Sequence, residues 1–187
     1  VINDVTVSTL IPYIDWTPFF RSWQLAGQFP ALLDDDIIGE TARDLYQDAT
    51  AMLAQIESEK WIEPKGIIGF YPAHSDGDDV VIFTDEERTK PLETFHFLRQ
   101  QMAKTDARPN LCLSDFIAPH DAGKTDYIGF FAVTTGLELA PRIEQFDNKN
   151  DTYNSILLKA LADRLVEAFA EYCHEQVRIY HWGYAPN

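Results

Sequence analysis

The feature that most constrains this chain is a long amphipathic segment, residues 153–174. Its apolar side chains recur at intervals of three and four, which is the spacing of one helical face. The stripe is broad and consists of Ile156, Leu157, Ala160, Leu161, Leu165, Ala168, Phe169 and Tyr172. A helix of this kind has to bury its stripe against other elements. We therefore expect a folded core built around a helix at Tyr153–His174.

Short apolar runs elsewhere have the length and boundaries of β-strands. Residues 66–73 lie between glycine and proline, and residues 80–84 follow the turn-forming stretch 75–79, so these two runs predict a hairpin. Residues 126–134 show the clearest strand pattern. Residues 91–99 fit either a strand or the start of a helix.

Other helices are predicted before and after these strands. Residues 37–59 have helical spacing, with one apolar face made of Leu45, Ala49, Met52, Leu53 and Ile56. Residues 137–147 predict a short helix that follows a break at Gly136.

The N-terminal part has weaker signals. Residues 1–14 have an extended pattern. Thr17 before Pro18 predicts a helix with Thr17 as its N-cap, which runs through Leu25 and ends at Gly27.

Helices and strands are mixed without regular βαβ alternation. This predicts an α+β fold in which helices flank a twisted antiparallel sheet. A chain of 187 residues is long enough for one domain with a sizeable core, so we expect residues 1–187 to form a single domain.

Charge and composition exclude several classes of function. The net charge of −15 disfavours binding to nucleic acid or to anionic membranes through a basic surface. Cys112 and Cys173 form no CxxC pair, so a reduced, cytoplasmic setting is expected. No apolar run approaches the roughly 18 residues that span a bilayer. The sequence shows no signal peptide and does not begin with Met, so we expect an excised fragment.

Motifs of self-contained catalysis are not evident. Gly66 and Gly69 lack the third glycine of a dinucleotide fingerprint, and neither a Walker sequence nor GxSxG nor HExxH occurs. The histidines show no metal-ligand spacing; they are His74, His96, His120, His174 and His181. We therefore predict neither catalytic nor metal-binding residues in this chain.

Asp15 allows two interpretations. It lies in an aromatic tract, Tyr13 to Phe20, where a carboxylate could receive a cationic or amine-bearing ligand, because charge-assisted hydrogen bonds are strong where water is scarce. It could equally cap the helix that begins near Pro18. The residues alone favour the cap.

Asp163 and Glu167 also allow two interpretations. They are four residues apart on one face of the long helix, where like charges repel by a few tenths of a kcal/mol. Arg164 is adjacent and can offset part of this repulsion. The pair is either a solvated face or a patch that contacts another domain.

Several segments, from about residue 11 onward, are informative by their order along the chain. They are Tyr13–Phe20, Asp48–Ala49 with Met52–Leu53, Gly66–Ala73, Leu98–Gln101, Cys112–Pro119, Asp126–Gly129, Phe131–Thr134, and the block from Lys159–Leu165 through Trp182–Pro186. Their co-occurrence in one order is more specific than any single motif. In this order the segments resemble one family, the activation domain of cobalamin-dependent methionine synthase.

The resemblance implies a function. In this family the domain binds S-adenosylmethionine and presents it to cobalamin, which is held by another domain of the enzyme. Reductive methylation then reactivates the oxidised cofactor, with an electron from flavodoxin or a flavoprotein reductase. The protein contributes mainly positioning. By resemblance, Asp15 binds the methionine end of the ligand, and Asp163 and Glu167 take part in the encounter with the cobalamin domain.

One departure from the family qualifies this. The family continues with an Arg-Pro-Ala-Pro-Gly-Tyr-Pro-like tract and two later tyrosines, whereas this sequence stops at Asn187. The resemblance therefore implies that the C-terminal segment of the domain and part of the ligand site are missing. We expect weak or no binding of S-adenosylmethionine by these residues alone.

Three other functions compete with this one. The chain could be a free-standing enzyme, although it shows no complete set of nucleophile, base or metal ligands. It could be an acidic interaction module that docks the cobalamin domain or flavodoxin without binding a ligand. It could also be an acidic mimic of nucleic acid, but only the net charge supports that hypothesis.

Overall fold

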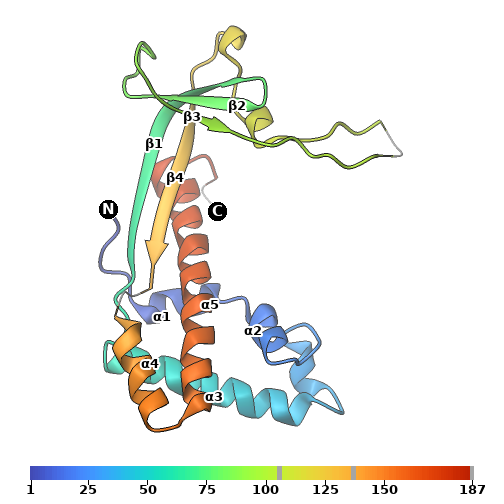
Figure 1. Cartoon of the computed structure of the whole chain (residues 1–187), viewed down its shortest axis with the longest axis vertical. Coiled ribbons are helices and arrows are strands. Elements are labelled where there is room, and N and C mark those ends of the chain that lie inside the picture. Colours follow the sequence, from blue (N-terminus) through green and yellow to red (C-terminus); the bar gives the residue numbers. More distant parts are fainter. Residues whose placement is uncertain (105–106, 136–137, 186–187) are drawn as a thin grey trace. The chain divides into compact units, whose positions relative to one another are not determined.

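The computed structural model describes residues 1–104, 107–135 and 138–185 (Figure 1). The chain forms two compact units. We call Val1–Ile67 with Phe131–Asn187 the helical unit, and Ile68–Phe130 the hairpin unit. Each unit is described separately below.

The helical unit contains the α-helices and three of the shorter helical turns. Its elements are α1 (Val7–Leu10), η1 (Ile11–Tyr13), α2 (Trp16–Ser22), η2 (Ala31–Asp34), α3 (Gly39–Ser58), α4 (Leu139–Asn148), α5 (Thr152–Gln176) and η5 (Val177–His181).

The predicted C-terminal helix is confirmed as α5, which is the centre of this unit. Helices α1, α2, α3 and α4 all contact it. Its inward face is fully buried and consists of Leu157, Leu158, Leu161, Leu165, Ala168, Phe169 and Cys173. The prediction was wrong for Ile156, which is 48% exposed. A residue is rotated by about 100° from its neighbour in a helix, so Leu157 faces the core and Ile156 faces outward.

The prediction of an extended N-terminus was wrong for residues 7–13. Ile2 does pair with Gly66 through two backbone hydrogen bonds of 2.7 and 3.1 Å. The chain then turns into α1, because the Thr6 side chain accepts a hydrogen bond from the Thr9 amide at 3.2 Å and caps the helix. Val7 and Leu10, three residues apart, are both buried, and this burial stabilises the short helix.

Helix α2 also begins and ends earlier than predicted. Its N-cap is Asp15 rather than Thr17, and the helix spans Trp16–Ser22 without reaching Leu25 or Gly27. Pro18 is therefore the third helical residue. It is tolerated there because the first four amides of a helix have no intrahelical partner in any case.

Helix α3 confirms the prediction for residues 37–59, and its predicted apolar face is buried. Asp35 accepts hydrogen bonds from the amides of Ile37 and Ile38 at 2.8 and 3.0 Å, just before the helix begins. Helix α4 confirms the predicted short helix from Leu139 onward. The predicted break at Gly136, and residue 137, lie outside the described residues.

The strands form a sheet in the order β3-β2-β1-β4. Their bounds are β1 (Lys65–Asp76), β2 (Asp79–Phe83), β3 (Pro91–His96) and β4 (Asp126–Thr134). The predicted hairpin and the predicted strand at 126–134 are confirmed. The ambiguous segment 91–99 becomes β3 because it pairs antiparallel with β2, with Val80 opposite Phe95. The antiparallel sheet and the helices confirm the α+β class.

The hairpin unit has a small core of its own. Ala73, Val80 and Ile82 are buried, and partly buried aromatic and aliphatic residues pack on them, namely Tyr71, Phe95, Phe97, Ile117, Ile128 and Phe130. The described residues that follow β3 extend away from the strands of this unit (Figure 1). Where they leave β3, Arg99 donates hydrogen bonds to Asp78, Asp115 and the carbonyl of Asn110, at 2.7 to 2.9 Å. None of the described helices is long and apolar enough to cross a bilayer.

Candidate functional site

The tract around Asp15 is mostly part of the core of the helical unit. Ile14, Trp16, Phe19 and Phe20 are buried. Their rings join a wider aromatic cluster, in which the ring of Trp16 lies 4.9 Å from that of Tyr46 and the ring of Phe20 stacks at 6.0 Å on Phe29. Asp15 is the exposed residue within this buried stretch. The packing of its neighbours therefore determines where its carboxylate lies.

The Asp15 side chain caps α2, which confirms the interpretation of this residue as a helix cap. Its Oδ1 accepts a hydrogen bond from the Thr17 amide at 3.0 Å. Among the described residues, Oδ2 has no hydrogen-bond donor or salt-bridge partner. The cap therefore uses one oxygen and leaves the other free to accept a hydrogen bond from an amine-bearing ligand. The ligand contact of Asp15 stays a prediction.

Tyr13, at the end of η1, fastens this tract to α5. Its hydroxyl donates a hydrogen bond to Oε2 of Glu175 in the last turn of α5. Its ring meets that of Tyr172 edge to face, with 5.6 Å between centroids. The hydrogen bond to Glu175, followed by burial, raises the pKa of Tyr13 to about 12. Sequence reasoning missed this contact because 162 residues separate its partners and no local pattern marks the pair.

Asp163 and Glu167 lie on the exposed side of α5, with side chains 69% and 51% exposed. The structure brings them together through Arg164, which is only 15% exposed. One guanidinium nitrogen lies 2.6 Å from Asp163 Oδ2, and another contacts Oε2 of Glu167. Arg164 thus contacts both carboxylates, which is the arrangement needed to offset part of their repulsion.

The structure does not join Asp15 to this pair by any hydrogen bond or ion pair among the described residues. Asp15 lies at the start of α2, whereas Asp163 and Glu167 lie on α5 itself. Glu175, which holds the Asp15 tract through Tyr13, comes eight residues after Glu167 on α5, or about 12 Å along the helix axis. The exposed carboxylate pair and the contact that holds the Asp15 tract therefore occupy neighbouring stretches of α5.

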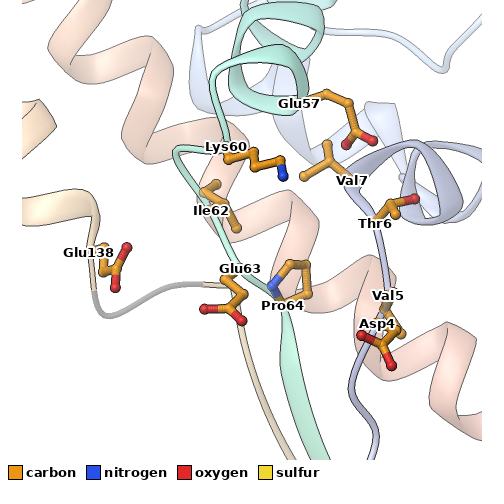
Figure 2. Close-up of a pocket in the computed structure, with 10 residues that line it drawn as sticks. All are labelled: Asp4, Val5, Thr6, Val7, Glu57, Lys60, Ile62, Glu63, Pro64 and Glu138. Carbon is orange, nitrogen blue, oxygen red and sulfur yellow. The ribbon is translucent and has the colours of Figure 1, made fainter.

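A separate pocket of about 460 Å³ lies elsewhere in the helical unit (Figure 2). It is lined by the chain before α1, the end of α3, the segment before β1, and Glu138. Among its acidic residues, Glu57 accepts hydrogen bonds from Ser8 at 3.0 and 3.1 Å, and Glu63 pairs with Lys65 at 3.0 Å. Neither Asp15 nor the pair on α5 is among the residues lining this pocket.

The histidines and cysteines form no metal site among residues 1–104, 107–135 and 138–185. His74 and His120 do meet in the hairpin unit, with 4.8 Å between ring centroids. Burial, together with repulsion from His120, lowers the pKa of His74. Cys112 and Cys173 are both buried and unpaired, and burial raises the pKa of the Cys173 thiol to about 11.

The fold and these residues define an α+β protein in which one candidate carboxylate caps α2 and two others lie exposed on the long helix α5. The chain belongs to the family described as the activation domain of vitamin B12 dependent methionine synthase, whose model matches residues 6–187.

The chain is also similar to a solved structure, the crystal structure of the MetH reactivation domain bound to AdoHcy. The two are 51% identical with a TM-score of 0.93, and the match covers 98% of this chain and 56% of that one. The chain thus spans little more than half the length of the solved chain that it matches.

Proposed function

We propose that this chain is part of an S-adenosylmethionine-binding domain that supports reductive reactivation of a cobalamin-dependent methionine synthase. Membership of the activation-domain family carries the proposal. The solved MetH reactivation domain, which is 51% identical and is bound to AdoHcy, supports it. AdoHcy is what S-adenosylmethionine becomes when its methyl group is transferred.

The chemistry asks for positioning rather than for a catalytic acid or base. The S–CH3 bond of the sulfonium breaks, its electron pair stays on sulfur, and the neutral thioether of AdoHcy results. Cobalamin, held by another domain and reduced by an electron from flavodoxin or a flavoprotein reductase, would supply the acceptor of the methyl group. Holding the sulfonium in line with that acceptor is the task of the present domain.

Asp15 is the residue of this chain that we assign to the ligand. Asp15 is exposed, and its free Oδ2 suits the α-ammonium group at the methionine end of S-adenosylmethionine, which donates up to three charge-assisted hydrogen bonds. The rigid aromatic packing around it preorganises the carboxylate, so little side-chain entropy is lost on binding.

We assign Asp163 and Glu167 to the contact with the cobalamin domain. Both carboxylates are exposed, and Arg164 holds each of them in place. Pairing with one arginine leaves a net charge of −1 on the three residues. That charge suits a partner surface with an additional cation.

Replacement of Asp15 tests the ligand assignment. Asn caps helices about as well as Asp does, so Asp15→Asn keeps α2 intact and removes the charge. A hydrogen bond to a charged group contributes about 1.5–3 kcal/mol, so AdoHcy affinity of the full-length enzyme should fall roughly 10- to 150-fold in calorimetry. Unchanged affinity would refute the assignment.

Residues 1–187 by themselves are expected to bind weakly or not at all, because they match only 56% of the solved chain that is bound to AdoHcy. Titration calorimetry of residues 1–187 with S-adenosylmethionine checks this. Micromolar affinity would show that these residues contain a sufficient site.

An acidic docking module without ligand binding is the second candidate, and the exposed carboxylates of α5 favour it. Reversing the charge of Asp163 and Glu167 in the full-length enzyme separates the roles. Lost reactivation with retained AdoHcy affinity assigns the pair to docking of the cobalamin domain or the flavoprotein. Lost AdoHcy affinity assigns the pair to the ligand site instead.

A further inference from the structure

We propose that Tyr13 is a positioning residue for Asp15, and that its hydrogen bond to Glu175 holds the Asp15 carboxylate in the orientation that accepts the ligand. The inference rests on the proposed function, because it concerns the same ligand site. It assigns a role in ligand binding to Tyr13 and Glu175, whose hydrogen bond fastens the Asp15 tract to α5.

The backbone between η1 and α2 is short enough for Tyr13 to control Asp15. Tyr13 is the last residue of η1, Ile14 is its C-cap, and Asp15 is already the N-cap of α2. Ile14 and Asp15 both have extended backbone angles, with ψ of 118° and 107°. The direction of the Asp15 side chain therefore depends on how the two ends of this two-residue link are held.

The two ends are held by different means. On the α2 side, Trp16, Phe19 and Phe20 are buried in the aromatic cluster. On the η1 side, Tyr13 is only half-buried, and its polar contact to α5 is the bond to the Glu175 carboxylate. A hydrogen bond to a charged acceptor is directional, so it fixes the rotation of the link more tightly than the edge contact with Tyr172 can.

Loss of the Tyr13 hydroxyl should therefore lower ligand affinity beyond what any loss of stability explains. Phenylalanine at position 13 would keep the ring contact with Tyr172 and the burial of Ile14. Only the hydrogen bond to Glu175 would be lost, and the Asp15 carboxylate would then sample more orientations. Ligand binding would have to restrict the carboxylate to one of them, and this entropic cost would lower the affinity for the ligand.

The test uses Tyr13→Phe in the full-length enzyme. We expect AdoHcy affinity to fall about three- to tenfold, whereas a variant that loses a similar bond elsewhere in the unit should lose stability alone. In reactivation assays, the concentration of S-adenosylmethionine giving half-maximal rate should rise while the maximal rate stays the same. Glu175→Gln keeps an acceptor for the hydroxyl and should lose less affinity than Tyr13→Phe.

Tyr153→Phe is the matched control. Tyr153 also donates its hydroxyl to a carboxylate, that of Asp48 at 2.6 Å, and burial with this bond raises its pKa to about 12. It belongs to the same unit but not to the Asp15 tract. Its replacement should leave AdoHcy affinity unchanged, whatever it does to stability.

A double-mutant cycle decides whether Tyr13 acts through Asp15. In an Asp15→Asn background, Tyr13→Phe should have no further effect on affinity. An equal loss in both backgrounds would overturn the positioning role. If Asp15→Asn weakens binding but neither Tyr13→Phe nor Glu175→Gln does, the role is also wrong and the proposed function stands. If Asp15→Asn has no effect, the ligand assignment itself fails.

Discussion

Gly66 lies where α5 packs against the start of β1, and a single added methyl group there should destabilise the protein. A Cβ at Gly66 would lie 3.0 Å from Cζ of Phe169 and 3.3 Å from Cγ1 of Val133. Phe169 is completely buried, so its ring has no solvent to move into. Overpacking of a core in this way costs about 1–3 kcal/mol. Gly66→Ala should therefore lower the melting temperature by roughly 2 to 12 °C, at about 2–4 °C per kcal/mol for a chain of this length.

The assay is urea unfolding followed by the helical circular dichroism signal. If the clash with Phe169 is the cause, Phe169→Leu should relieve it. The cost of Gly66→Ala should then be smaller by at least about 0.5 kcal/mol in the Phe169→Leu background than in the wild type. Equal costs in the two backgrounds, or a cost below about 0.5 kcal/mol in the wild type, would refute this reasoning.

Gly77→Ala provides the control. Gly77 has φ of +60° and no atom within 4 Å of an added Cβ. Its replacement should cost about 1–2 kcal/mol through the left-handed backbone alone. That cost should not depend on the residue at position 169.

Three other predictions concern stability. Asp15→Ala should cost about 1 kcal/mol of unfolding free energy and Asp15→Asn almost nothing, in urea unfolding, because Asn keeps the cap. The lowered pKa of His74 means that the unfolded chain binds a proton which the folded chain does not, so stability should fall as the pH drops below 6.5; His74→Gln should flatten this dependence between pH 7.5 and 5.5. The hydrogen bond from Arg99 and that from the Cys112 amide lower the pKa of Asp115 to about 2. Ionised Asp115 therefore contributes to the free energy of unfolding fully above pH 3.8, and this contribution should disappear as the pH falls toward 2. Arg99→Met should remove this part of the pH dependence, which an acid titration of the folded fraction measures.

The candidate site was only partly predictable from the sequence. The tract at Asp15 stood out by its composition, but the residues alone could not separate a cap from a ligand contact. The structure shows that one carboxylate oxygen caps α2 and leaves the other free. The family was indicated by the order of many segments rather than by the chemistry of any one of them. Tyr13 and Glu175 were not predictable as a pair, because their contact exists only after α5 has packed against η1.

The sequence by itself determined the elements whose signals are local. The core helices α3 and α5, the β1–β2 hairpin and β4 follow from periodicity and turn residues within each segment, and the structure confirms them. Only the tertiary structure decided the rest. Residues 7–10 are helical because Val7 and Leu10 find a buried environment, and residues 91–96 form a strand because β2 offers a partner edge. Short segments have too few internal contacts to offset the loss of backbone entropy, so their conformation depends on neighbours that are distant in sequence.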